Sequence, residues 1–245
     1  MFIIDSVFNT VLKYSAKGGV SRAEWRIFMS GTIAAVFVVI GAYLLGSIPW
    51  GFIIGRIYGV DVRTVGSKNI GATNVTRTVG RIPGKICFVL DFLKGGLPVL
   101  AALQIAAADV WRSGAEWVVL AVMLATIIGH IFPVFLHFKG GKGVSTAAGA
   151  IMALAPIPLL VAFTVWVIVF LVSRYVSLAS ISAAAVLPVV AWAFAVANVG
   201  STVARSNLTL IFLTVIAVLA IVRHHSNIQR LLNGTESRFG KDKKA

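Results

Sequence analysis

Long apolar runs alternate with short polar segments along the chain. Runs of about 20 apolar residues match the thickness of a lipid bilayer, so the pattern predicts membrane-spanning helices. The expected spans are Thr32–Ile57 with a break near Pro49, Ile86–Ala108, Trp117–Phe138, Ala147–Val172, Leu178–Ala197 and Leu208–Val222.

The run Ala147–Val172 decides the number of helices. As one helix it would be about 39 Å long, too long for one untilted span and short for two full ones. Its prolines, in "APIP" at Ala155–Pro158, favour a hairpin of two short helices, because proline ends or kinks a helix. This interpretation gives seven helices. The alternative of one tilted helix gives six, and would put the C-terminal tail across the membrane from Lys142.

Composition places the whole chain in the membrane. Of its residues 58% are hydrophobic and only 12% are charged, whereas soluble domains carry about a quarter charged residues. We therefore predict an all-α polytopic integral membrane protein. The chain has a single cysteine, Cys87, so it cannot form an internal disulfide.

The net charge of +14 indicates an orientation. With seven helices, an N-terminus outside and a C-terminus in the cytoplasm, most of the Lys and Arg residues fall in cytoplasmic segments, as the positive-inside rule expects. The four basic residues between Lys13 and Arg26 are on the other side and argue against it. The basic residues are not interleaved with aromatic ones, so we expect no nucleic-acid partner.

Three parts of the chain can be distinguished. We expect an N-terminal extension over residues 1–30, for which an amphipathic helix on the membrane surface is one interpretation, and a single transmembrane catalytic domain over residues 31–240. A basic tip follows over residues 241–245.

The first polar stretch, Gly66–Arg81, reads "GSKNIGATNVTRTVGR". Arg77 and Arg81 are four residues apart, a spacing that puts both guanidinium groups on one face if the segment is helical. Arginine forks match phosphate oxygens, so the pair predicts an anion site. The alternative is an ordinary solvated loop, whose basic residues are explained by the positive-inside rule alone.

The second stretch, Phe138–Gly149, reads "FKGGKGVSTAAG". Its glycines let backbone amides approach an anion, Lys142 adds a full charge, and Ser145 or Thr146 could cap the next helix. It is not a Walker A loop, because Gly143 follows the lysine where Ser or Thr is required. The alternative to this phosphate cradle is a flexible turn.

The third stretch, Val222–Glu236, contains an apolar stripe suited to a helix on the membrane surface. His224 and Asn227 are three residues apart and share a face. His224 is therefore the candidate general base. The alternative is a juxtamembrane anchor with solvated histidines.

Ionisable residues also occur within the spans. Asp91 and Lys94 are three apart, and we expect them to pair, because a lone charge in the bilayer is costly. We expect His130 and His137 to form hydrogen bonds between helices. No cluster of histidines, cysteines and carboxylates has the spacing of a metal site, so no metal is predicted.

Together, the blocks "GSIPWGFIIGR", "GSKNIGATNVTRTVGR", "GHIFPVFLHFKGGKGVSTAAG" and "RHHSNIQRLLNGTE" resemble the signature blocks of the bacterial acyl-phosphate:glycerol-3-phosphate acyltransferases, the PlsY type. The resemblance covers Gly46–Glu236. Two positions depart from the usual pattern: Lys68 replaces a glycine and Ser145 replaces an alanine. Neither departure removes a group that could bind an anion.

The resemblance implies transfer of a fatty acyl group from acyl phosphate to glycerol 3-phosphate, the first step of phospholipid synthesis, with lysophosphatidic acid and phosphate as products. It implies a multi-pass protein of the bacterial inner membrane with seven helices and a cytoplasmic active site. No cofactor and no obligate protein partner are expected besides the two substrates and membrane lipid.

The family pattern also implies residue roles. The donor phosphate would be held by Gly141, Lys142, Gly143, Ser145 and Thr146, and glycerol 3-phosphate by Ser67, Asn69, Arg77, Arg81, His224 and Asn227. Asn74, Asp91 and Lys94 are left without an assigned role. The base is either His224 or an oxygen of the donor phosphate, because no histidine has the H-x-x-x-x-D partner of other glycerolipid acyltransferases.

Two other functions fit part of this pattern. A transporter of a phosphorylated solute would also need basic residues and broken helices, but it would be expected to have polar groups on both faces and repeated halves. A scaffold that recruits anionic lipid explains the charge but not the Gly-Lys-Gly turn.

Overall fold

Helices make up the regular structure of the computed structural model, which describes residues 22–108, 111 and 114–240. They are α2 (Arg22–Ser47), α3 (Trp50–Ile57), α4 (Ala72–Thr78), α5 (Arg81–Ala107), α6 (Ala115–Ile131), η2 (Val134–Leu136), α7 (Val144–Leu154), α8 (Pro156–Ser173), α9 (Val176–Val196), α10 (Asn207–Arg223) and α11 (His225–Leu232). No strand occurs in this part of the chain, so the all-α prediction is confirmed.

Five helical segments in the described part are long and apolar enough to cross a membrane: Gly31–Ile57, α5, Ala115–Leu136, α8 and α9. The helices α10 and α11 are long and apolar enough to cross a membrane only when they are taken together, and a bend of 53° separates them. Three expected helix boundaries differ by five residues or more. The helix of the first span, α2, begins at Arg22 rather than Thr32, and the second span begins at Arg81 rather than Ile86. In the third span, α6 ends at Ile131 rather than Phe138, where the chain turns into the short η2.

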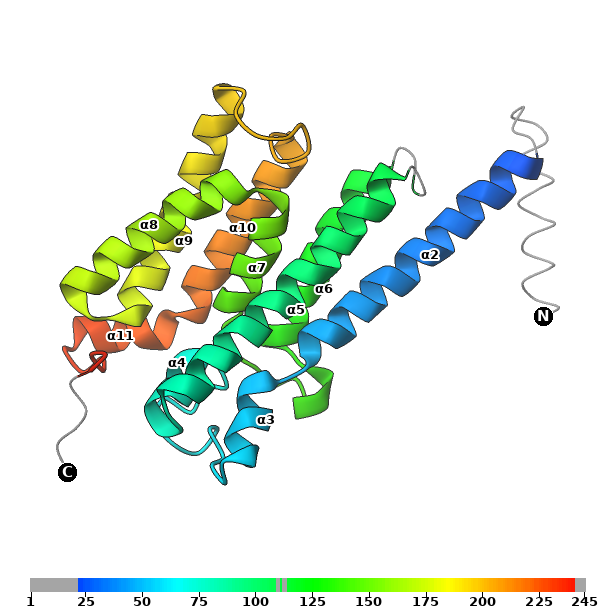
Figure 1. Cartoon of the computed structure of the whole chain (residues 1–245). Helices are drawn as coiled ribbons and strands as arrows, with labels where there is room; N and C mark the ends of the chain where they lie inside the picture. The colour runs from blue at the N-terminus through cyan, green and yellow to red at the C-terminus, as the bar shows by residue number, and fades with distance from the viewer. Residues whose placement is uncertain (1–21, 109–110, 112–113, 241–245) are drawn as a thin grey trace.

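Prolines produce the two predicted breaks. The first span is interrupted at Pro49, between the end of α2 and the start of α3. The "APIP" run divides into α7 and α8, which meet at Ala155, and the chain reverses direction there (Figure 1). The hairpin interpretation of this run is therefore confirmed. With 11 residues, α7 is about 16 Å long and does not cross a bilayer alone.

The predicted terminal segments fall largely outside the described residues. Of the extension over residues 1–30, only the part from Arg22 is described, and there α2 has already begun. The basic tip over residues 241–245 lies entirely outside the described residues.

Glycines bring α5 and α7 into close contact. A Cβ on Gly149 would lie 1.9 Å from the Phe92 carbonyl oxygen, and one on Gly95 would lie 2.0 Å from the Thr146 carbonyl oxygen. Small residues let helix backbones approach in this way, which membrane helices use in place of a hydrophobic driving force. The crossing fixes the start of α7, and with it the Gly-Lys-Gly segment, against α5.

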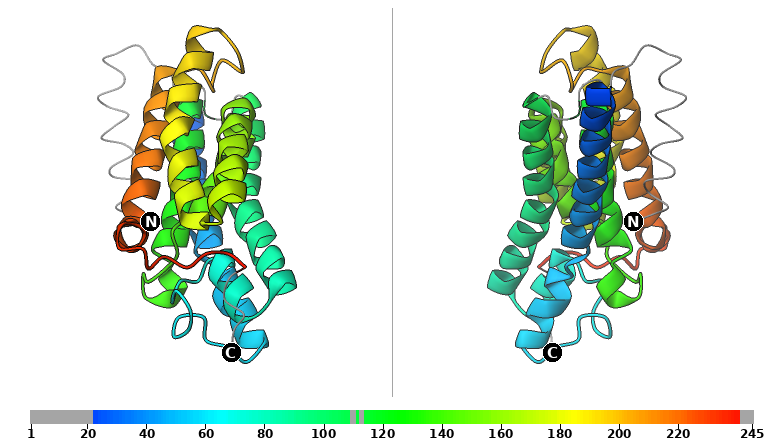
Figure 2. Two further views of the ribbon diagram at one scale, coloured as in Figure 1. Left: turned by 90° about the vertical axis from the view of Figure 1, so that its left-hand side faces the viewer. Right: turned by 90° about the vertical axis from the view of Figure 1, so that its right-hand side faces the viewer.

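The polar segments collect at one end of the bundle. The segment around α4, the turn before α7, the α8–α9 turn and α11 lie together at the lower end in Figure 1, and the two views of Figure 2 agree. The α9–α10 connection lies at the opposite end. Helix reversals between α7 and α10 thus return the chain twice, at the ends of α8 and α10, to the end where a polar site could form.

Candidate active site

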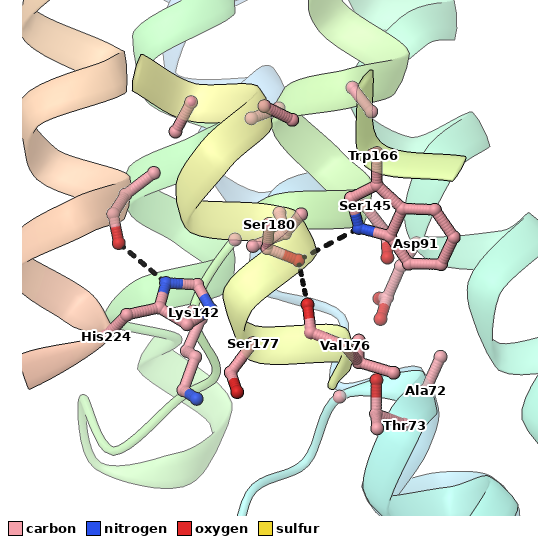
Figure 3. A pocket seen from close by; sticks show the side chains of 18 of the residues that line it. Ala72, Thr73, Asp91, Lys142, Ser145, Trp166, Val176, Ser177, Ser180 and His224 are labelled. Carbon is pink, nitrogen blue, oxygen red and sulfur yellow. Dashed lines mark hydrogen bonds between the residues drawn. The ribbon is translucent and has the colours of Figure 1, made fainter. Parts of the chain in front are cut away.

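A cavity of about 440 Å³ lies at this end of the bundle, between α4, α5, α7, α8, α9 and α10. Its polar part is lined by Ser67, Asn69, Thr73, Asn74, Arg77, Asp91, His130, Lys142, Ser145, Ser177, Ser180, His224, Asn227 and Glu236. Its apolar part is lined mainly by Phe88, Ala147, Ala148, Ile151, Leu159, Ala162, Phe163, Ala183, Ala184, Leu187, Ile216, Ala217 and Ala220. Figure 3 shows Lys142, Ser177 and His224 on the same side of this pocket.

Direct contacts join the three polar stretches. The Lys142 ammonium group donates a hydrogen bond to the Asn227 side-chain oxygen, which links the second stretch to the third. Arg223 donates to the Gly141 carbonyl oxygen at 3.1 Å. Arg77, from the first stretch, donates to the Ser237 carbonyl oxygen at 3.0 Å. Ser237 directly follows the third stretch, so segments that are far apart in the sequence lie together in the fold.

Arg77 and Arg81 do not share a helix face, so that prediction was wrong. The helix α4 ends at Thr78, and the chain turns at Gly80, whose φ of 149° is open to glycine but strained for other residues. Arg81 is the first residue of α5, is exposed, and does not line the cavity. Arg77 does line it, and its Nε is buried without a hydrogen-bond partner in the described part of the chain.

Asn74 shapes the first stretch from within. Its side-chain oxygen accepts from the Ser67 amide at 2.8 Å, and its NH₂ group donates to the carbonyl oxygens of Val62 and Val65 at 2.8 and 3.2 Å. The side chain is 1% exposed. These bonds fold the loop and place Ser67 and Asn69 at the cavity.

The second stretch begins its helix differently from the prediction. The N-cap of α7 is Gly143, with a left-handed φ of 79°, and no side chain caps the helix. Ser145 lines the cavity as expected. Thr146 does not: it is fully buried, and its hydroxyl lies 3.1 Å from His130 Nδ1. Gly141 also stays out of the cavity lining.

Lys142 lies among cationic neighbours. Burial lowers the pKa of its ammonium group from 10.5 to about 8; Arg230, Arg77 and Arg223 add to that effect, while Glu236 opposes it. A lysine in this position remains largely charged at neutral pH, but it is less stable as a cation than an exposed lysine. An added anion would relieve this repulsion.

His224 is neutral and oriented. Its Nδ1 lies 2.7 Å from the Ala220 carbonyl oxygen, which can only accept a hydrogen bond, so Nδ1 carries the proton and Nε2 keeps its lone pair. Burial and then the charge of Lys142 lower the pKa of His224 to about 4. The ring is 4% exposed and lines the cavity.

The buried ion pair predicted in the second span is present. The Lys94 ammonium nitrogen lies 2.7 Å from Asp91 Oδ1, and Asp91 also lines the cavity. His130 contacts α7 through Thr146, as predicted for a histidine between helices. His137 is exposed in the turn after η2 and forms no hydrogen bond between helices within the described residues, so that prediction was wrong.

Glu236 and Ser177 belong to the site but had no assigned role in the sequence analysis. One carboxylate oxygen of Glu236 accepts from Ser177 and Asn227, each at 2.7 Å, and the other accepts from Arg230 at 2.7 Å. Burial alone raises the pKa of Glu236, but these three donors outweigh it and the pKa is lowered. A lone acidic residue in an otherwise basic stretch was the signal available in the sequence.

Comparison with known proteins agrees with this geometry. A family model described as glycerol-3-phosphate acyltransferase matches residues 36–234. The chain belongs to the glycerol-3-phosphate acyltransferase family. The resemblance seen in the sequence blocks, and the enzyme class it implied, are thereby confirmed.

Relatives named glycerol-3-phosphate acyltransferase match over nearly their whole length. The protein from Desulforamulus reducens is 47% identical over 86% of this chain and 98% of its own. The protein from Aquifex aeolicus is 47% identical over 84% of this chain and 99% of its own. Because the match covers almost the whole length of these relatives, and the chain has several apolar spans, we identify it as an integral membrane acyltransferase.

Solved family structures have the same fold. The crystal structure of PlsY, an integral membrane glycerol 3-phosphate acyltransferase, in its glycerol 3-phosphate form matches with a TM-score of 0.75 at 46% identity, over 84% of this chain and 96% of the other. Its lysophosphatidic acid form matches with a TM-score of 0.72 at the same identity and coverage.

Proposed function

We propose that this enzyme transfers a fatty acyl group from acyl phosphate to glycerol 3-phosphate in the cavity between α4 and α10. A hydroxyl oxygen of glycerol 3-phosphate attacks the acyl carbonyl carbon, the bond from that carbon to the phosphate oxygen breaks, and lysophosphatidic acid and inorganic phosphate leave. The relatives carry the acyltransferase name, and the PlsY structures hold glycerol 3-phosphate and lysophosphatidic acid.

The observation that carries the proposal is the two-part lining of the cavity. Lys142, Arg77 and His224 lie at one part, and alanines and other apolar side chains of α7, α8, α9 and α10 line the other. A substrate with an anionic head and a fatty chain matches both parts at once. A soluble phosphorylated solute would leave the apolar part unused.

The donor phosphate is assigned to Lys142, Gly143 and Ser145. The first amides of α7 have no acceptor within the helix and carry its partial positive charge, so an anion there is stabilised by both. Gly141 acts differently, because its amide already donates to the His130 carbonyl oxygen at 3.1 Å. We assign Gly141 and Thr146 to the shape of the loop and not to direct contact with phosphate.

Glycerol 3-phosphate is assigned to Arg77, Ser67, Asn69, Asn227 and His224. The orphan Nε of Arg77 provides a charged donor for its phosphate. Because Lys142 already contacts Asn227, the two phosphate positions are neighbours. Holding both reactants at one place supplies several kcal/mol towards the barrier through proximity. Arg81 has no part in this assignment.

The proton of the attacking hydroxyl is assigned to the departing phosphate. His224 Nε2 can accept a hydrogen bond from that hydroxyl and so orient it, but the pKa of about 4 makes the imidazolium ion unfavourable beside Lys142. Even an esterified phosphate has a second pKa near 6, above the pKa of His224, so an oxygen of the departing phosphate binds the proton more readily. His224 thus positions the nucleophile without becoming charged.

The membrane arrangement follows the charge pattern. We propose seven apolar helices, counting α7 and α8 separately, in the bacterial inner membrane, with the N-terminus outside and the cavity and C-terminus on the cytoplasmic side. This places the basic segments at the polar end of the bundle in the cytoplasm, where soluble glycerol 3-phosphate would reach them.

The direct test is an assay with purified protein, palmitoyl phosphate and labelled glycerol 3-phosphate. We expect labelled lysophosphatidic acid and an equal amount of inorganic phosphate, and loss of both with Lys142→Ala while the protein remains folded. Counterflow of glycerol 3-phosphate in vesicles without any lysophosphatidic acid would refute the proposal in favour of a transporter.

A further inference from the structure

A cluster of buried polar residues lies behind the Gly-Lys-Gly segment. Asp91, Lys94, His130 and Thr146 are 1%, 7%, 4% and 0% exposed. They come from α5, α6 and α7, and the reaction described above uses none of them directly. Burying four polar side chains is costly unless they are paired, so their arrangement calls for a function.

His130 touches both ends of the loop Gly140–Thr146. At one end, its backbone oxygen accepts from the Gly141 amide at 3.1 Å. Its ring packs on the same residue so closely that a Cβ on Gly141 would lie 2.1 Å from Nε2. At the other end, Nδ1 lies 3.1 Å from the Thr146 hydroxyl. One imidazole therefore holds the two points between which Lys142, Gly143 and Ser145 are presented.

The imidazole is itself held from the side of α5. Asp91 Oδ1 lies 3.5 Å from His130 Nδ1 and 2.7 Å from Lys94 Nζ. Lys94 in turn donates to the Ile48 carbonyl oxygen at 2.7 Å. That carbonyl lies between α2 and α3, next to Pro49, which has no amide hydrogen. The cluster therefore ties the loop to the break in the first span.

We propose that Asp91, Lys94, His130 and Thr146 form a positioning cluster that fixes the loop Gly140–Thr146 in its phosphate-binding shape. The identity of the phosphate rests on the proposed function, but the loop geometry does not. The cluster acts through Lys142, Gly143 and Ser145, and it need not contact substrate. A loop rich in glycine has many conformations, and holding it in one reduces the entropy lost on binding.

The test compares Thr146→Val with Thr146→Ser. Valine keeps the shape of threonine but removes the hydroxyl that meets His130, whereas serine keeps the hydroxyl. Thr126→Val is a matched control: Thr126 is also buried, but its hydroxyl donates to the Met123 carbonyl oxygen of its own helix at 2.8 Å. The probe is inorganic phosphate, whose binding to purified protein in detergent is measured by calorimetry.

Thr146→Val is expected to weaken phosphate binding by about threefold to tenfold, the range for loss of one hydrogen bond. It should raise the KM for palmitoyl phosphate by a similar factor and leave kcat within twofold. Thr146→Ser and Thr126→Val should behave like the unchanged protein. A merely structural role would lower the melting temperature and the active fraction without changing either constant.

Equal phosphate affinity in Thr146→Val and the unchanged protein would overturn the proposal. If Thr146→Val fails to fold, Gly141→Ala tests the contact between Gly141 and the His130 ring. Its added methyl group must displace the loop from His130. Unaltered phosphate affinity in Gly141→Ala would overturn the proposal equally. An unchanged protein that binds phosphate but makes no lysophosphatidic acid refutes the proposed function alone. If Thr146→Val raises the KM for glycerol 3-phosphate and not that for palmitoyl phosphate, only the assignment of this loop to the donor phosphate is refuted.

Discussion

The charge of Lys142 gives the activity a predictable limit at high pH. The ammonium group is half-buried and lies near Arg77, Arg223 and Arg230, so its pKa lies at about 8 instead of 10.5. The depressed pKa means that the cation is present below about pH 8 and is lost as the pH rises through that value. If Lys142 binds the donor phosphate as a cation, kcat/KM for palmitoyl phosphate must fall over the same range.

The magnitude follows from the titration. With a pKa of about 8, Lys142 is about nine-tenths charged at pH 7 and about one-tenth charged at pH 9, so kcat/KM should fall about tenfold between these values. The profile of kcat, which reports the enzyme–substrate complex, should turn down at a higher pH, because bound phosphate stabilises the cation. The substrates' phosphate groups titrate near pH 6 and contribute little here.

The assay is initial-rate release of inorganic phosphate from pH 6.5 to 9.5, with palmitoyl phosphate varied and glycerol 3-phosphate held at a fixed concentration well below its KM. Lys142→Arg keeps its charge throughout this range, so any activity it retains should lack the alkaline fall. Lys139→Ala changes an exposed lysine of the same turn and should leave the profile unaltered. A kcat/KM that stays level to pH 9.5, or an alkaline fall that persists in Lys142→Arg, would refute a cationic role for Lys142.

Three further outcomes are expected. Arg77→Ala should raise the KM for glycerol 3-phosphate by about tenfold or more, the effect of losing a charged hydrogen bond, whereas exposed Arg81→Ala should change it less than twofold; equal effects would refute the separation of the two arginines. Glu236→Gln should lower the unfolding free energy by about 1.5–3 kcal/mol, because its charged hydrogen bonds are weakened, measured by denaturation in detergent; unchanged stability would contradict the network. Gly149→Ala should lower the melting temperature, because its Cβ would meet the Phe92 carbonyl oxygen at 1.9 Å; an unaltered melting curve would contradict the close α5–α7 crossing.

The linear pattern of residues determined where the helices begin and break, because apolar runs and prolines act on the chain locally. Span length follows from apolar runs, and the breaks at Pro49 and in "APIP" follow from the chemistry of proline. The sequence blocks also identified the family and most of the polar residues that line the cavity. The Asp91–Lys94 pair was predictable for the same reason, since three residues of helix bring the two side chains onto one face.

Tertiary structure decided which polar groups face the cavity. The turn at Gly80 separates Arg81 from Arg77, and the packing of α6 against α7 turns Thr146 towards His130 and away from the cavity. Ser177 and Glu236 are 59 residues apart and meet only because the start of α9 and the segment after α11 lie at the same place. Residue type and spacing fix the direction of a side chain within one helix. Which neighbour it meets depends on helix crossings, which are set by close backbone approaches between distant glycines and not by local pattern.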